Sequence, residues 1–241
     1  MSARETSTVQ EQDVAPGTAE RDDHGTPDRI AAAIVRGILE RRYMPGERIT
    51  EAELTSTFGV GRGAVREAFR ILSASGAIDL TRHRGAVICT LTEADCRELL
   101  DVTEVLLGLA ARSAARSIEF GNNRAMLGAV AQALRQRHSG RALPNVLDER
   151  LDFYNVMLRI AANRELARAL PLARAQIFRA QFYNDLTPDD LRAMIEEYRG
   201  IVDAILAGDE ANAERRMREH VERTGDRLMP RVFKHWRRKH G

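Results

Sequence analysis

The stretch from Ile49 to Gly85 constrains the fold more than any other part of the chain. Apolar residues recur at helical spacing on both sides of Gly59 and Gly61, and these glycines permit the sharp backbone bend that joins two short helices. Two short, mainly apolar stretches follow at 77–80 and 86–89, and their length predicts two short strands. The segment therefore predicts a helix-turn-helix that continues into a two-stranded ribbon.

The outward face of the second predicted helix carries a row of arginines. Arg62, Arg66 and Arg70 are four residues apart, so they share one helix face. Gly63 lies between the first two and is small enough to let the helix approach another surface closely. Because a guanidinium can bind phosphate or the O6/N7 edge of guanine, this row suits the major groove of DNA. The alternative is a small helical corner whose arginines are only solvated.

This segment resembles the winged helix-turn-helix of the GntR family of bacterial transcription regulators. The match is the string Val60-Gly61-Arg62-Gly63-Ala64-Val65-Arg66-Glu67-Ala68-Phe69-Arg70-Ile71-Leu72, with Arg84-Gly85 in the ribbon. The resemblance implies double-stranded DNA as a partner and a set of candidate contact residues, which are Glu51, Arg62, Gly63, Arg66, Arg70, Arg84 and Gly85. Ala52 and Ala64 replace residues that relatives often use to touch DNA, so no operator sequence can be transferred.

The charge distribution agrees with a DNA-binding function for one part of the chain. The formal net charge of the 241 residues is only +2, but residues 29–88 hold ten arginines against six acids, and residues 1–28 are acidic. A local basic excess suits a DNA-binding domain, whereas a non-specific coat for nucleic acid would be basic throughout. Residues 1–26 contain almost no large apolar side chains, so we expect a disordered tail. The DNA-binding domain then spans residues 27–91.

Cysteine usage and hydropathy indicate where such a protein works. Cys89 and Cys96 are the only cysteines, and neither belongs to a CxxC motif or a Cys/His cluster. We expect two free thiols in a reducing cytoplasm. The sequence has no apolar run long enough to cross a bilayer and no signal-like amino terminus. These features predict a soluble, cytoplasmic protein with no membrane partner.

Residues 92–238 are predicted to be helical throughout. Breaks at glycine, asparagine and proline divide this region into six helices, at about 93–118, 123–138, 145–162, 164–184, 188–207 and 210–238. No strand signal interrupts them, so the predicted packing is an all-α antiparallel bundle of six helices. The expected fold is therefore mainly α, with a winged helix-turn-helix followed by this bundle.

The helical region resembles the FCD effector domain of the FadR-type branch of GntR regulators. The resemblance depends on Phe153-Tyr154, on Ala161-Ala162-Asn163, and on the stretch from Asp203 to His220. Six helices resemble the VanR-like subgroup more than the seven-helix subgroup. The resemblance implies that this domain binds a small-molecule effector and forms a homodimer.

The resemblance also implies a metal site whose ligands this chain has lost. Many FCD domains hold a divalent metal between an Asp-x3-His pair and two further histidines. The matching positions here are Arg150, Tyr154 and Tyr198, and only His220 keeps a ligand. One imidazole beside a guanidinium cannot hold a transition metal, because the guanidinium stays protonated and repels the cation. We therefore expect no metal and no other cofactor.

The same four side chains could serve a metal-free pocket. Arg150, Tyr154, Tyr198 and His220 together would recognise a carboxylate or phosphate on an apolar or aromatic body. The alternative is that both tyrosines fill the vacated cavity as core while Arg150 reaches solvent. On the first effector helix, relatives commonly carry Arg and, four residues on, Glu. Here the positions are Thr103 and Leu107, so that ligand contact is absent.

These patterns lead to one functional expectation and two alternatives. We expect a ligand-responsive, homodimeric, sequence-specific DNA-binding transcription regulator that reads a palindromic operator and acts as a repressor. One alternative is a non-specific architectural DNA binder. The other is an all-helical enzyme, but no Ser/His/Asp set, P-loop or paired-carboxylate motif supports it.

Overall fold

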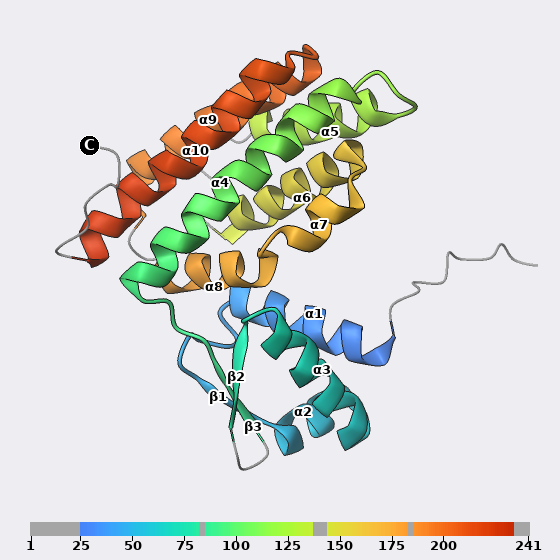
Figure 1. Cartoon of the computed structure of the whole chain (residues 1–241), viewed down its shortest axis with the longest axis vertical. Helices are drawn as coiled ribbons and strands as arrows, with labels where there is room; N and C mark the ends of the chain where they lie inside the picture. The colour runs from blue at the N-terminus through green and yellow to red at the C-terminus, as the bar shows by residue number, and fades with distance from the viewer. Residues whose placement is uncertain (1–24, 82–84, 137–143, 183–185, 234–241) are drawn as a thin grey trace, which may run out of the picture.

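The computed structural model describes residues 25–81, 85–136, 144–182 and 186–233, without side chains for residues 134–136 and 144–151. Within these ranges the chain forms two domains (Figure 1). The predicted disordered tail, residues 1–26, lies outside the described residues except for its last two positions. Among the described residues, none of the helices is both long and apolar enough to cross a bilayer.

The N-terminal domain is a winged helix-turn-helix, as predicted. Its elements are α1 (Thr26–Leu39), β1 (Arg48–Thr50), α2 (Glu51–Phe58), α3 (Arg62–Ala74), β2 (Ile78–Thr81) and β3 (Gly85–Ile88). The strands form an antiparallel sheet in the order β1-β3-β2. The sequence did not predict β1, because three residues are too few to show an alternating pattern.

Local sequence sets the corner between α2 and α3. The Thr50 hydroxyl accepts a hydrogen bond from the Glu53 N–H at 3.2 Å and caps the start of α2. Helix α2 ends at Gly59, whose φ of 63° lies in the left-handed region that favours glycine. Helix α3 begins after Gly61, which offers no side chain for capping. Leu54 and Val65 are fully buried, so the two helices share one core.

The C-terminal domain is all-helical, but the number of helices differs from the prediction. It contains α4 (Glu93–Arg116), α5 (Asn123–Gln136), α6 (Pro144–Ala161), α7 (Arg164–Ala169), α8 (Leu172–Phe182), α9 (Pro188–Leu206) and α10 (Glu210–Val232). The described residues thus form seven helices instead of six, since the expected helix 164–184 is broken between α7 and α8. Leu170 is extended, with ψ 124°, because the following Pro171 disfavours a helical residue before it.

Helices α4 and α10 pack along each other over most of their length (Figure 1). Helix α4 starts at a capping box in which Thr92 and Asp95 satisfy each other's backbone N–H. Small side chains then let the two axes approach. At Gly108, an added Cβ would lie 2.7 Å from Cγ of Arg218 on α10. The packing of α4 against α10 is therefore the main helix–helix contact of the helical domain.

Helix α8 of the C-terminal domain packs against α1 of the N-terminal domain (Figure 1). Ile177 and Phe182 of α8 belong to the same apolar cluster as Ile34 of α1. The Gln181 carboxamide holds the backbone of Leu91 between the domains: Oε1 accepts from the Leu91 N–H and Nε2 donates to the Leu91 carbonyl, both at 2.8 Å. The interdomain segment is therefore fixed to α8.

Replacing Gln181 by leucine should release this segment without unfolding the protein. Leucine keeps an apolar stem but removes both hydrogen bonds, each of which contributes about 0.5–1.5 kcal/mol. We expect the Leu91 amide to exchange with solvent deuterium roughly tenfold faster. Gln132→Leu, on an exposed position of α5, is the matched control. Unchanged exchange at Leu91 in the Gln181 variant would show that the clamp does not hold the segment.

Candidate DNA interface and effector pocket

Helix α3 presents its arginines on the side opposite its core. Val65, Ala68, Phe69 and Leu72 are buried, whereas Arg62, Arg66 and Arg70 are exposed. Gly63 lies on the same open surface, since an added Cβ there would meet nothing within 4 Å. The structure therefore brings the predicted α3 residues together on one accessible face. Arg70 forms an ion pair with Glu67, one helical turn earlier on the same face.

Arg66 is held by a buried carboxylate from the preceding helix. Its Nε donates to both carboxylate oxygens of Glu51, at 3.0 and 3.1 Å. The Glu51 side chain is only 10% exposed, while that of Arg66 is 55% exposed. The carboxylate thus holds the inner nitrogen of the guanidinium, and the outer end reaches solvent. Glu51, a predicted DNA-contact residue, therefore orients the Arg66 side chain from the buried side of the helix-turn-helix.

The ribbon formed by β2 and β3 borders a groove beside α3. The groove is lined by Glu51, Arg66, Phe69, Arg70, Leu80, Thr81 and Gly85. Gly85 itself is buried, and a Cβ at this position would lie 2.8 Å from the Ile49 carbonyl oxygen. It therefore allows β3 to approach β1 closely. Arg84, the predicted wing contact, lies outside the described residues.

Leu80 is a groove residue that the sequence analysis missed. Its side chain is 53% exposed between α3 and the ribbon, although it belongs to an apolar run. Apolar side chains at such a position can contact the methyl group of thymine. No sequence signal pointed to it, because the run 77–80 predicts a buried strand and does not show which residues face outward.

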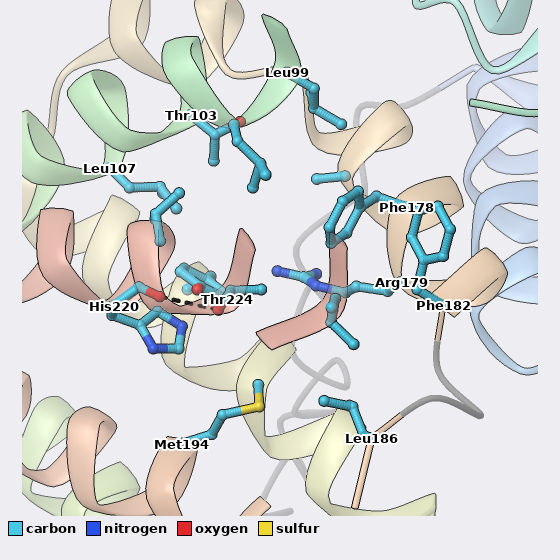
Figure 2. A pocket seen from close by; sticks show the side chains of 15 residues that line it. Leu99, Thr103, Leu107, Phe178, Arg179, Phe182, Leu186, Met194, His220 and Thr224 are labelled. Carbon is cyan, nitrogen blue, oxygen red and sulfur yellow. Dashed lines mark hydrogen bonds between the residues drawn. The ribbon is translucent and has the colours of Figure 1, made fainter. Parts of the chain in front are cut away.

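The helical domain contains a small cavity, about 60 Å³ in volume, among α4, α6, α8, α9 and α10 (Figure 2). Most of its wall is apolar and comes from side chains such as Leu99, Leu107, Phe178, Phe182, Met194 and Val221. The polar groups in the wall are those of Thr103, Tyr154, Arg179, His220 and Thr224. A mainly apolar wall with a few polar groups is typical of a small-molecule site.

The predicted effector residues occupy different places around this cavity. Tyr154 and His220 line it. Tyr198 is 1% exposed and lies outside the lining, where its hydroxyl is 3.2 Å from that of Tyr154 and its ring is 4.5 Å from the His220 ring. The side chain of Arg150 lies outside the described residues. Tyr154 is therefore part of the cavity wall, and Tyr198 is part of the core behind that wall.

His220 is oriented by a buried carboxylate that the sequence analysis did not single out. Its Nδ1 lies 2.7 Å from Oε2 of Glu197, and both side chains are nearly inaccessible. Burial raises the pKa of the Glu197 carboxyl, but hydrogen bonds from His220 and Arg227 outweigh this effect and hold the pKa below its ordinary value. Glu197 is thus ionised at neutral pH and fixes the orientation of the imidazole.

The family of the chain follows from comparison with known proteins. The family model described as "FCD domain" matches residues 98–223, which is more than half of the chain. The model described as "Bacterial regulatory proteins, gntR family" matches residues 26–88. The chain belongs to the GntR family. It is a DNA-binding transcription regulator of the FadR-type branch, with an effector-binding FCD domain.

Individual relatives of this GntR regulator agree with that assignment. A protein of Paenarthrobacter nicotinovorans named "Probable D-xylose utilization operon transcriptional repressor" is 29% identical over 78% of this chain and 82% of its own length. The galactonate operon transcriptional repressor of Escherichia coli is 39% identical over 25% of this chain and 27% of its own. The structure of E. coli McbR/YncC has a TM-score of 0.72 at 15% identity, covers 86% of this chain and 99% of its own, and supports the fold.

Membership of the GntR family excludes the enzyme alternative, because this family consists of transcription regulators. Within the FCD domain, the described residues contain no group of three or more His, Cys, Asp or Glu side chains close enough to ligate a metal ion. Arg179 and Glu197 had no sequence signal. Arg179 reaches the cavity only after α8 has packed beside α4, and Glu197 reaches His220 only after α9 has packed against α10.

Proposed function

We propose that this GntR regulator is a homodimeric repressor that binds a palindromic operator through α3 and leaves it when a small carboxylate enters the FCD cavity. The observation that carries the proposal is the exposed arginine face of α3, with Arg66 oriented by Glu51. Relatives named as repressors of the D-xylose, galactonate and gluconate operons support repression. A DNA-binding regulator works at the chromosome, so we propose a cytoplasmic location.

Selection of bound duplexes from a random pool tests the proposal. One α3 helix reads few base pairs, so specificity requires two copies related by a twofold axis. We expect a palindrome whose half-sites are about one helical turn apart. A monomer that shows no preference among duplexes would contradict the proposal. A non-specific architectural binder would behave differently: its affinity for every sequence alike would fall by about three to five orders of magnitude between 50 and 200 mM salt.

The exposed apolar part of α4 supports a dimer contact with a second copy of the chain. Val102 and Val105 are 49% and 54% exposed and lie one turn apart on the same helix face. Substituting Val105 by glutamate places a charge where a dimer would bury apolar surface. We expect the dimer dissociation constant to rise at least about tenfold, and operator affinity to fall with it.

Light scattering on the eluting protein measures this change in mass. Leu172→Glu is the control, because Leu172 is also an exposed large apolar residue but lies at the start of α8. Dissociation in the Leu172 variant and an intact dimer in the Val105 variant would place the dimer contact elsewhere than on this face of α4.

We propose further that the cavity works without a metal ion. The support is chemical: Tyr154 and Tyr198 occupy two positions where relatives carry ligands, and Glu197 already binds His220. Metal analysis of the purified protein decides this point, and stoichiometric zinc or nickel removable by a chelator would contradict it. The expected VanR-like subgroup depended on a count of six helices, whereas the described residues of the FCD domain form seven.

The position of α8 supports a response of DNA binding to the ligand. Phe178 belongs both to the cavity wall and to the apolar cluster shared with the DNA-binding domain, and Gln181 holds the interdomain segment. A ligand that shifts α8 therefore changes the placement of α3. The effect on operator affinity equals the difference in ligand affinity between the DNA-competent and the incompetent arrangement.

A further inference from the structure

Arg174 of α8 lies directly against the end of α3, the helix that carries the exposed arginine face. Helix α3 closes with a Schellman turn. In this turn the Gly76 N–H donates to the Ser73 carbonyl at 3.0 Å, and the next N–H, that of Ala77, donates to Leu72 at 2.9 Å. Gly76 has a φ of 67°, and a Cβ at this position would lie 3.1 Å from Cδ of Arg174. The apolar stem of Arg174 therefore packs on the backbone that ends α3.

The guanidinium of Arg174 binds the start of the other domain. Its Nη2 donates to Oδ1 of Asp95 at 2.8 Å. The second oxygen of the same carboxylate, Oδ2, accepts from the Thr92 N–H at 3.0 Å in the capping box that begins α4. Hydrogen bonds from Thr92 and Arg174 hold the pKa of the Asp95 carboxyl below its ordinary value, so it is ionised at neutral pH. One side chain of α8 thus joins the end of α3 to the start of α4.

Arg174 is one of two polar attachment points on the same face of α8. Gln181, which holds the backbone of Leu91, lies seven residues further along, or about 10 Å along the helix axis. The apolar cluster between α1 and α8 also joins the domains (Figure 1), but apolar burial is not directional and does not fix an angle. Two polar contacts that are separated along one helix restrict rotation about that apolar contact.

The angle between the domains matters for a dimer that reads two half-sites. Each α3 is carried by its own helical domain, so its placement on that domain sets the distance and rotation between the two α3 helices. One extra base pair between half-sites moves a half-site by about 3.4 Å and rotates it by about a tenth of a turn. How firmly α3 is fixed therefore determines which half-site spacings the dimer accepts.

We propose that Arg174 is a positioning residue that fixes α3 relative to the helical domain and thereby sets the half-site spacing of the operator. The Arg174 and Asp95 side chains are 34% and 35% exposed, so their ion pair contributes little to the stability of the fold. Its effect is on the angle between the domains. This inference rests on the proposed function, because a spacing preference requires a homodimer on a palindromic operator.

Binding of the full-length protein to duplexes of different spacing tests this role. The probes are the palindrome selected from the random pool, the same palindrome with one or two base pairs inserted or removed at its centre, and a single half-site. We expect wild type to lose at least about tenfold in affinity for each base pair of altered spacing. Arg174→Ala removes both the stem and the charge and should lose at most about threefold, while its affinity for the single half-site stays unchanged.

Further variants separate the stem of Arg174 from its charge. Arg174→Met keeps the stem and should give an intermediate spacing penalty, whereas Arg174→Lys also keeps the charge and should retain most of the wild-type preference. Asp95→Asn weakens the same ion pair from α4, so combining it with Arg174→Met should relax the spacing no further. Arg168→Met, at an exposed arginine paired with Glu165 on α7, is the matched control and should behave as wild type.

An unchanged spacing preference in Arg174→Ala would overturn the proposal. So would an equal loss of affinity for the half-site and for every spaced palindrome, because that pattern is expected of a residue that only supports the fold or contacts DNA itself. Circular dichroism in urea shows whether each variant keeps the stability of wild type. Wild-type protein without preference for any palindrome would contradict the proposed regulator, whereas a wild-type preference that all variants share would contradict only the role of Arg174.

Discussion

Substituting Arg66 by alanine should lower the affinity of the dimer for its operator by about two to three orders of magnitude. A bidentate contact between arginine and guanine contributes about 1–3 kcal/mol, and a palindrome presents it twice. The Glu51 carboxylate restricts the guanidinium before DNA arrives, at 3.0 and 3.1 Å from Nε, so little side-chain entropy is lost on binding. Fluorescence anisotropy with a labelled operator at fixed salt measures the change.

Arg70→Ala is the matched control for this prediction. Arg70 lies one turn further along the same face, is 71% exposed and pairs only with Glu67 on its own helix among the ion pairs described. An exposed ion pair of this kind contributes little to stability, so Arg70→Ala should leave the fold intact. If Arg70 contacts a phosphate, its loss should lower the affinity for all DNA sequences alike, by a few fold, and reduce the salt dependence of binding. Equal losses in the two variants would contradict a special role for Arg66.

Glu51→Gln separates orientation from contact. Glutamine keeps an oxygen near Arg66 but removes the charge, so the guanidinium is held less firmly. We expect operator affinity to fall by about three- to tenfold, with a relaxed preference at one base pair of each half-site. If Glu51 contacted DNA itself, removal of its negative charge would instead raise the affinity.

The sequence predicted the shared arginine face of α3, because that feature is local. A spacing of four residues places Arg62, Arg66 and Arg70 on one face wherever the helix lies in the fold. The pair between Glu51 and Arg66 spans 15 residues and depends on the angle between α2 and α3, which spacing does not specify. Gly85 shows the same limit, since its motif position suggested DNA contact while its backbone packs against Ile49.

The cavity was harder to predict, because its polar groups come from four helices that are distant in the chain. Arg179 faces the cavity only because α8 begins a new direction after Pro171, and the predicted continuous helix 164–184 concealed that change. The proline itself was a usable signal, since the residue before a proline is disfavoured in a helix. The Thr103 hydroxyl oxygen, by contrast, is buried without a hydrogen-bond partner among the described residues, which is a property of packing that no sequence pattern records.

Tyr154 lies in the cavity wall and Tyr198 lies behind it. Their positions bear on the two alternatives, that these side chains bind a ligand or that they fill the former metal site as core. Phe153, Tyr154 and Tyr198 form a compact aromatic cluster, with ring centres 5.4 to 6.1 Å apart. Tyr198 is only 1% exposed and also contacts the His220 ring. Its side chain therefore supports the wall from which Tyr154 and His220 face the cavity.

Substituting Tyr198 by alanine should destabilise the protein by about 3–5 kcal/mol, because it leaves a large void behind the wall and removes the hydroxyl partner of Tyr154. Tyr198→Phe keeps the ring and should cost only about 1 kcal/mol. Tyr154→Phe is the companion variant, since it removes the other half of the same hydrogen bond from a residue in the wall. Urea unfolding followed by circular dichroism measures all three. If Tyr198 instead contacted the effector from an open site, its replacement by alanine would change ligand affinity with little loss of stability, and a small shift in the urea midpoint would show that the residue is not core.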